Sequence, residues 1–175
     1  MRSGLAGSDG RITHAEHRLL IPWRSPTGSI TCVQRRVIDD RTTGRYVLPA
    51  ERSPLWPYGV DRARDVATND PGAGIAFVEG AADVLAFREL AVSGGHNIAV
   101  LGIPSATEWR APWATFAAAR RAFIAVDNDD AGNKRVPTMH HDLVVAGATF
   151  VGRIVPNGTK DWADQLQNEG QENQS

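Results

Sequence analysis

Four short apolar runs after residue 74 are separated by segments whose apolar residues have helical spacing. Residues 81–92, 113–121 and 131–146 predict helices, and Pro137 must lie in the first turn of the third helix or kink it. Strands that alternate with helices predict an α/β domain, with a parallel sheet of about four strands flanked by helices. We expect right-handed crossovers and a site at the carboxyl ends of the strands. The runs of strand length are Ile75–Val78, Asn97–Leu101, Ala122–Val126 and Ala148–Val155.

The first part of the chain has a different pattern, in which extended runs are joined by turn residues. Leu19–Trp23 and Ser29–Ile38 predict two strands, and Pro26–Gly28 supplies the turn of a hairpin between them. Arg45–Pro49 predicts a further short extended piece. We therefore expect a small basic β-rich subdomain over residues 19–64, followed by the α/β domain over residues 65–167. The remaining polar segments predict a flexible leader (1–18), a linker at the start of the α/β domain (65–74) and a polar tail (168–175).

The composition excludes several classes of protein. With 175 residues, of which 42% are hydrophobic, the chain can bury the core of one domain and a smaller partner. Its single cysteine, Cys32, excludes a disulfide framework and a Cys-rich zinc module, so we expect no zinc site and a cytoplasmic location. His14 and His17, like His140 and His141, are expected on the surface. No apolar segment predicts a secretory leader or a membrane span, and no membrane partner is expected.

The net charge of -1 conceals an uneven distribution along the chain. Residues 1–64 hold 11 Lys and Arg against 6 Asp and Glu, whereas residues 65–175 hold 8 against 14. A basic part followed by an acidic part suits a protein whose first part holds a polyanion and whose second part holds cations. Uneven surface charge without a partner explains the counts equally well.

Acidic residues follow two of the predicted strands and recur near the end of the chain. Glu79 closes the first strand, and Asp83 lies four residues further on. Asp127 and Asp129 follow the third strand, and Asp161 belongs to the last acidic group. Gathered carboxylates repel one another unless a cation lies among them, and hard divalent cations prefer oxygen ligands. The pattern therefore predicts a metal site for phosphate chemistry.

Each acidic group also has a purely structural interpretation. Asp83 alone would complement the dipole of a helix N-terminus, and Asp129 or Asp130 alone would cap a helix. Lys134, just after the second acidic group, could contact a triphosphate or simply be exposed. The chain has no phosphate-loop motif, which argues against a motor ATPase.

In combination these motifs resemble the Toprim domain, which bacterial-type primases, type IA and type II topoisomerases and certain nucleases share. The resemblance covers residues 19–167. It implies that Glu79, Asp83, Asp127 and Asp129 are catalytic, and that Glu79, Asp127, Asp129 and Asp161 hold Mg²⁺ or Mn²⁺. The motifs that carry it are Glu79-Gly80-x-x-Asp83, Asp127-x-Asp129-x-Ala131-Gly132 and Gly158-Thr159-Lys160-Asp161, the last of which is similar to the Gly-x-Lys-Asp segment of the primase branch.

The residues upstream of these motifs are similar to the basic subdomain that precedes Toprim in DnaG-type primases. A proline-containing strand, a glycine turn, an arginine-bearing strand and a Lys-Tyr pair characterise that subdomain. The resemblance implies that Arg35, Arg36, Arg45 and Tyr46 line a groove for the template and the nascent primer. Arg45 stands where the family has Lys, which keeps the charge but changes the geometry of its contacts.

The resemblance implies a DNA primase catalytic core, a DNA-directed RNA polymerase that makes short RNA primers from NTPs by metal-dependent nucleotidyl transfer. Its partners would be a single-stranded DNA template and NTPs, with Lys134 and Lys160 at the nucleotide. A replicative helicase or a separate zinc-binding module would be further partners, because the chain lacks the Cys/His module and the following helical segments of longer primases. Two alternatives stay open: a Toprim-type metal-dependent nuclease and a non-catalytic module that binds nucleic acid.

Overall fold

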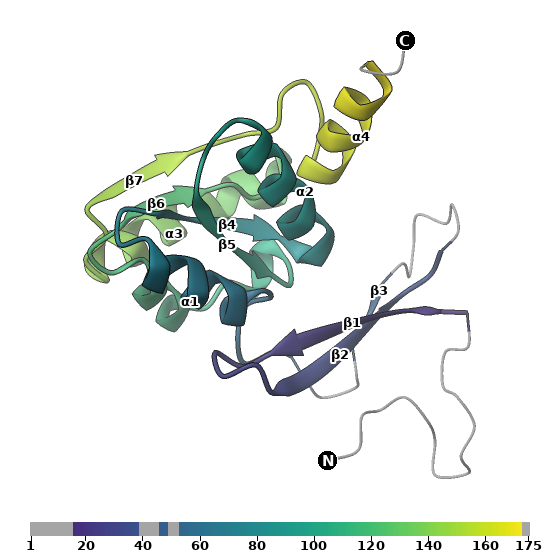
Figure 1. Cartoon of the computed structure of the whole chain (residues 1–175), viewed down its shortest axis with the longest axis horizontal. Helices are drawn as coiled ribbons and strands as arrows, with labels where there is room; N and C mark the ends of the chain where they lie inside the picture. The colour runs from purple at the N-terminus through teal and green to yellow at the C-terminus, as the bar shows by residue number, and fades with distance from the viewer. Residues whose placement is uncertain (1–15, 39–45, 49–52, 173–175) are drawn as a thin grey trace. The chain divides into compact units, whose positions relative to one another are not determined.

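The computed structural model describes residues 16–38, 46–48 and 53–172 (Figure 1). The chain divides into two compact units, Met1–Trp56 and Pro57–Ser175. This division lies earlier than the predicted boundary between residues 64 and 65. The predicted leader lies outside the described residues, except for its last three positions.

The first unit contains a three-stranded antiparallel sheet in the order β1-β2-β3. Its strands are β1 (Leu19–Arg24), β2 (Ile30–Arg36) and β3 (Tyr46–Val47). Gly28, with φ +84°, forms the turn between β1 and β2, and its carbonyl accepts a 2.7 Å hydrogen bond from the guanidinium of Arg24. Trp23 lies opposite Cys32 in the register, and both side chains are buried. The predicted hairpin is therefore confirmed.

The second unit is built on a four-stranded parallel sheet in the order β5-β4-β6-β7 (Figure 1). The predicted fold class, a parallel sheet of about four strands flanked by helices, is confirmed. The strands are β4 (Gly74–Glu79), β5 (Ile98–Ile103), β6 (Arg121–Ile124) and β7 (Phe150–Arg153).

Helices cover both faces of this sheet because successive residues of each strand point to opposite sides. Ile75 and Phe77 pack with residues of α1, η2 and α3 in one core. Ala76 and Val78 pack with residues of α2 and the start of α4 in the other. The helices are α1 (Val60–Asn69), α2 (Gly80–Ser93), α3 (Asp130–Val145) and α4 (Trp162–Glu172), and η1 (Ala106–Glu108) and η2 (Ala111–Ala117) are short 3₁₀ helices.

Helix α1 occupies part of the segment that was predicted to be a linker. Val60, Ala63 and Val66 recur at helical spacing, and all three contact the same core. The many polar residues of this segment concealed that apolar stripe.

The prediction of a helix over residues 113–121 was wrong. The segment predicted as a helix over 113–121 contains the 3₁₀ helix η2, in which Ala114 and Ala117 are both buried because residues three apart align in a 3₁₀ helix. Residues 168–172, predicted as a polar tail, continue helix α4. Of the two predicted placements of Pro137, the first turn is excluded, because Pro137 lies in the interior of α3, which begins at Asp130.

The strand order reverses at β4, and such a reversal is expected to leave a crevice at the carboxyl edge of the sheet. The chain passes from β4 through α2 to β5 on one side, and then returns to pair β6 with the other side of β4. Open α/β sheets bind ligands outside the carboxyl ends of the two strands at such a reversal. Here these ends are those of β4 and β6. No helix in the described part of the chain has the length and hydrophobicity needed to cross a bilayer.

Candidate active site

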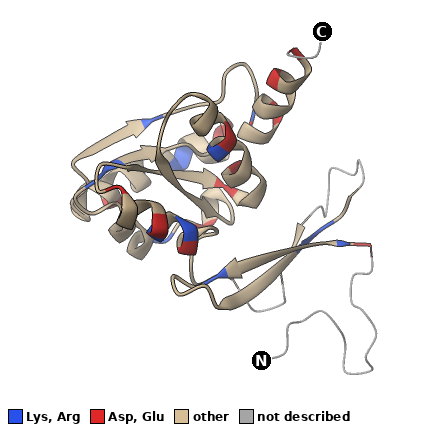
Figure 2. Ribbon diagram, in the orientation of Figure 1, with Lys and Arg blue, Asp and Glu red and all other residues tan. Residues whose placement is uncertain are grey.

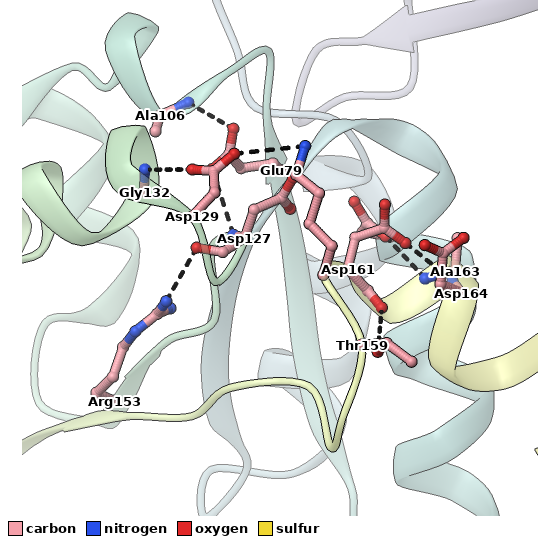
Figure 3. Close-up of polar contacts among 12 residues, drawn as sticks. Glu79, Ala106, Asp127, Asp129, Gly132, Arg153, Thr159, Asp161, Ala163 and Asp164 are labelled. Atoms are coloured by element: carbon pink, nitrogen blue, oxygen red, sulfur yellow. Dashed lines mark hydrogen bonds and ion pairs between the residues drawn. The ribbon is translucent and has the colours of Figure 1, made fainter. Parts of the chain in front are cut away.

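Glu79 connects β4 to the loops that follow both neighbouring strands (Figure 3). It is the last residue of β4, and its Oε2 accepts a 2.8 Å hydrogen bond from the backbone N–H of Ala106, after β5. Its Oε1 accepts a 3.3 Å hydrogen bond from the backbone N–H of Asp127, after β6. The carboxylate is thereby fixed at the crevice, between the two loops.

Asp127 and Asp129 follow β6 and lie beside Glu79 (Figure 3). Asp129 is the N-cap of α3, and its Oδ1 accepts a 2.9 Å hydrogen bond from the N–H of Gly132. The Oδ1 atom of Asp127 is buried and has no hydrogen-bond partner. A buried carboxylate oxygen without a donor is costly, so this atom is suited to a cation.

Gly132 lets the helix start close against the Asp127 loop. A Cβ atom at this position would stand 2.2 Å from the carbonyl oxygen of Asp127 and 3.4 Å from Oε1 of Glu79. The first of these distances is far shorter than any van der Waals contact. The glycine of the second acidic motif is therefore required by packing at the site itself.

Lys160 brings a positive charge to the two aspartates. Its Nζ lies 3.4 Å from Oδ2 of Asp129 and 3.8 Å from Oδ2 of Asp127. The backbone N–H of Asn128 donates a 3.0 Å hydrogen bond to the carbonyl of Lys160, so the two loops are also joined through their backbones. The third sequence motif thus contacts the second.

The electrostatic environments of the three central carboxylates differ. Burial raises the pKa of Glu79, and burial together with the charge of Glu79 raises the pKa of Asp127 to about 7. The pKa of Asp129 is lowered, because the N–H of Gly132 and the ammonium of Lys160 favour its charged form. Partial burial opposes the charge of Lys160, but its contacts with Asp129 and Asp127 outweigh this effect and raise its pKa. A divalent cation would relieve the charge that burial disfavours.

Asp83 joins helix α2 to the start of α4. It lies in the first turn of α2, its side chain is buried, and its Oδ1 accepts a 2.9 Å hydrogen bond from the N–H of Ala163. Burial and the charge of Asp161 raise the pKa of Asp83 to about 7. This contact joins α2 to the first turn of α4, close in the sequence to Lys160.

Asp161 caps helix α4. Its Oδ1 accepts a 2.8 Å hydrogen bond from the N–H of Asp164, and its carbonyl accepts one from the hydroxyl of Thr159 (Figure 3). The adjacent Trp162 donates a 2.6 Å hydrogen bond from its indole to the carbonyl of Ala125. The capping contact thus gives Asp161 a structural role at the start of α4.

Arg153 is a residue of the site that the sequence interpretation missed. From β7 its guanidinium donates to the carbonyls of Val126, at 2.6 Å, and Asp127, at 3.1 Å. Its pKa is lowered by burial. It therefore supports the backbone that presents Asp127. A single charged residue inside an otherwise apolar predicted strand was the available signal.

The predicted metal ligands do not form a ready-made ligand set. Within residues 16–38, 46–48 and 53–172, no three His, Cys, Asp or Glu side chains are grouped so as to hold a metal ion. Glu79 is held by backbone N–H groups, Asp161 caps α4, and Lys160 contacts the other two ligands. Among the described residues, the ammonium of Lys160 is the positive group that contacts Asp127 and Asp129.

The residues predicted to contact nucleic acid or nucleotide differ in their exposure to solvent. Arg35 is only 4% exposed, so its guanidinium is not presented to solvent. Arg36 lies over the ring of Tyr46, with 5.1 Å from its Cζ to the ring centroid, and Tyr46 is partly exposed. Arg45 lies outside the described residues, and Lys134 is exposed on α3.

The described part of the first unit is basic (Figure 2). Arg18, Arg24, Arg35 and Arg36 stand there against Glu16. These arginines are contributed by the hairpin strands and the residue just before them, so the basic character predicted from the sequence is concentrated on one small sheet.

The histidines expected on the surface divide into three cases. His17 is buried and contacts the carboxylate of Glu16 at 3.0 Å, contrary to the prediction. His14 lies outside the described residues, whereas His140 and His141 are exposed on α3.

Comparisons with known proteins agree with this architecture. A family model described as Toprim-like matches residues 76–166, which include Glu79, Asp83, Asp127, Asp129 and Asp161. No curated protein matches the sequence.

Several solved structures of primases have a similar fold. The zinc-binding and RNA polymerase domains of the Aquifex aeolicus primase match with a TM-score of 0.65 and 22% identity over 90% of this chain and 38% of that one. A DnaG primase catalytic domain bound to single-stranded DNA matches with a TM-score of 0.66 and 18% identity over 98% of this chain and 54% of that one. The RNA polymerase domain of Mycobacterium tuberculosis DnaG matches with a TM-score of 0.62 and 22% identity over 98% and 58%.

The chain therefore spans between 38% and 58% of the length of these structures. The similarity extends over the antiparallel sheet of the first unit as well as the parallel sheet of the second, because it covers nine-tenths or more of this chain. With the family match over more than half of its residues and the acidic motifs at the crevice of its parallel sheet, the chain belongs to the Toprim-like family and has the fold of a DnaG-type primase catalytic core.

Proposed function

We propose that this chain is the catalytic core of a DNA primase, which synthesises short RNA primers from NTPs on a single-stranded DNA template by metal-dependent nucleotidyl transfer. The observation that carries the proposal is the position of Glu79, Asp127 and Asp129 at the crevice beyond β4 and β6. The fold resemblance to primase cores, which includes the first unit, supports this function over that of other Toprim proteins.

The residues present fit the divalent cation that this chemistry requires. Their donor atoms are carboxylate oxygens, which Mg²⁺ and Mn²⁺ prefer, and the buried Oδ1 of Asp127 has no other partner. Asp127, Asp129 and Glu79 would hold the cation, with Asp161 as a further candidate. When bound, Mg²⁺ or Mn²⁺ would neutralise charge on the triphosphate and stabilise the attacking and leaving oxygens of the displacement.

The remaining residues of the site would position these ligands and the substrates. Arg153 holds the backbone of Asp127, and Asp83 holds the start of α4. Lys160 and the exposed Lys134 would contact the nucleotide triphosphate. These contacts would bring the α-phosphate into line with the 3′-hydroxyl of the primer.

The basic first unit would hold the template. Arg36, Arg45 and Tyr46 are the proposed contacts for phosphates and bases, because a guanidinium pairs with phosphate and an aromatic ring stacks on a base. Arg35 would reach a template only if its buried side chain moved. A separate zinc-binding module and a replicative helicase are the further partners that we propose, in a reducing cytoplasm suited to a chain with a single cysteine, Cys32.

A template-directed incorporation assay tests this proposal. The wild-type protein is incubated with a single-stranded DNA template, labelled NTPs and Mg²⁺ or Mn²⁺, in parallel with Glu79→Gln and Asp127→Asn. We expect short RNA products from the wild-type protein and a loss of at least about a hundredfold in each variant, because charge stabilisation is lost. Circular dichroism checks that both variants remain folded.

The same samples distinguish primer synthesis from the nuclease alternative. Labelled single-stranded and double-stranded DNA are incubated with the cation in the absence of NTPs. Primer synthesis without cleavage supports the proposal. Metal-dependent cleavage without synthesis would identify a nuclease, and neither activity, under conditions in which nucleic acid still binds, would identify a non-catalytic module.

A further inference from the structure

Lys160 occupies the position at which a cation would be expected between two aspartates. Its ammonium lies within 4 Å of one oxygen of Asp127 and one oxygen of Asp129. The guanidinium of Arg153, by contrast, donates to backbone carbonyls and to the side-chain oxygen of Asn133. In the part of the chain that the structure describes, Lys160 is thus the basic residue that contacts these two carboxylates.

The backbone of Lys160 is fixed, but its side chain is free to move. The carbonyl of Lys160 accepts a hydrogen bond from the N–H of Asn128, and the next residue, Asp161, caps α4. Gly158, with φ +69°, allows the turn that leads into this segment. The side chain of Lys160 nevertheless remains 58% exposed. It can therefore leave the carboxylates for solvent without any rearrangement of the loop.

The ammonium satisfies the carboxylates only in part. It contacts Oδ2 of Asp127, at 3.8 Å, whereas Oδ1 of the same group is buried without a partner. A divalent cation carries twice the charge and can contact several oxygens at once. Lys160 and such a cation cannot occupy the same space between Asp127 and Asp129, so the two must compete.

We propose that Lys160 is an internal counter-ion that neutralises Asp127 and Asp129 when no divalent cation is bound, and that a divalent cation must displace it. The inference rests on the proposed function, because it assigns a regulating role at the same site. Competition lowers the affinity for the cation. Once displaced, the ammonium lies at the rim of the site on a fixed backbone, where it can pair with the triphosphate of a nucleotide.

The direct test is the binding of Mn²⁺ alone, measured by the electron paramagnetic resonance signal of free Mn²⁺. Lys160→Met removes the counter-ion, and we expect it to bind Mn²⁺ roughly three- to tenfold more tightly than the wild-type protein, as for loss of a partly exposed ion pair. Lys160→Arg keeps the charge and should retain weak binding. Arg121→Gln, at an exposed position at the amino end of β6, controls for the loss of one positive charge and should change the affinity less than twofold.

Thermal unfolding in EDTA provides a second measurement that does not depend on activity. Lys160→Met should unfold at a lower temperature than the wild-type protein in EDTA, because its carboxylates are uncompensated, and saturating Mn²⁺ should remove the difference. Equal or weaker Mn²⁺ binding by Lys160→Met, when the wild-type protein binds Mn²⁺, would overturn the counter-ion role and leave the proposed function intact. Absence of Mn²⁺ binding in the wild-type protein and in Lys160→Met would instead overturn the metal site itself.

Discussion

Two carboxylates, that of the buried Asp83 and that of the partly buried Asp127, link the stability of the second unit to pH. Asp83 and Asp127 both have a pKa raised to about 7, and burial is the largest cause for each. An acid whose pKa is higher in the folded than in the unfolded protein stabilises the fold while it is protonated. That stability is full below the unfolded pKa, near 4, and decreases as the pH rises towards 7.

The first prediction concerns the pH dependence that Asp83 produces. Asp83→Asn keeps an oxygen that can accept from Ala163 but cannot ionise. In EDTA we expect the variant to be more stable than the wild-type protein at pH 8, by about 2–4 kcal/mol, and to differ little at pH 4. Urea unfolding monitored by circular dichroism across this range measures the difference.

Mg²⁺ is the control for this prediction. If the raised pKa values report a site that lacks its cation, saturating Mg²⁺ should reduce the pH dependence of the wild-type protein. A variant that is less stable than the wild-type protein at pH 8 would show that the charged form of Asp83 is favourable, contrary to the burial argument.

Not all residues of the site were equally predictable from the sequence. Glu79 and Asp127 could be placed because each follows an apolar run, and the ends of neighbouring parallel strands meet at one edge. The contact of Lys160 with Asp129 could not be derived, since it depends on a turn whose direction no local pattern specifies. Arg153 was missed because its role consists of bonds to backbone carbonyls, which leave no sequence motif.

At the scale of elements, the success of a prediction followed the strength of the periodic pattern. The apolar runs of the sheet and helix α2 are long or distinct enough to be recognised. Helix α1 has only a narrow apolar stripe. Helix α4 is anchored chiefly by Trp162, whose ring centroid lies 4.7 Å from that of Phe87. Both helices are therefore stabilised by tertiary contacts that a local pattern does not reveal.

Two helical glycines provide a prediction with a matched control. Gly132→Ala places a Cβ atom against the carbonyl of Asp127, so the start of α3 must shift, and we expect a loss of about 1–3 kcal/mol of stability. Gly170→Ala in α4 meets no atom within 4 Å and should gain about 0.5–1 kcal/mol, because alanine favours helix. Thermal unfolding of both variants measures the contrast.

Mn²⁺ binding at the site is a second measurement for the same pair of variants. Displacement of the Asp127 loop in Gly132→Ala should weaken Mn²⁺ binding, whereas Gly170→Ala should bind as the wild-type protein does. Equal stability and equal Mn²⁺ binding in the two variants would contradict the close packing at Gly132.

At the scale of the whole molecule, a basic unit precedes an acidic one in the chain. The antiparallel sheet of the first unit carries Arg24 and Arg36, and the parallel sheet of the second presents acidic residues at one edge. The division of charge was visible in the sequence. The structure likewise divides the chain into two units, the first basic and the second acidic. The exact boundary between the two units was not predictable, because α1 begins inside the segment that the sequence analysis assigned to the first unit.

Salt dependence of nucleic-acid binding tests the role of the first unit. Affinity for single-stranded DNA should fall steeply with salt, because phosphate contacts release bound counter-ions. Arg36→Gln should weaken binding and reduce the slope of log affinity against log salt by about 0.7–1. Arg121→Gln also removes one positive charge, but at the amino end of β6, away from the crevice. It should leave the slope of log affinity against log salt unchanged. Equal slopes for both variants would remove Arg36 from the interface.

The central claim is that the carboxylates beyond β4 and β6 hold a divalent cation. A crystal structure of the protein with Mn²⁺, examined by anomalous scattering at the manganese edge, tests it most directly. The account predicts a peak in contact with Asp127 and Asp129 and close to Glu79, with the ammonium of Lys160 displaced from its present contacts. A map with no peak at these carboxylates, and with Lys160 still between Asp127 and Asp129 at saturating Mn²⁺, would contradict it.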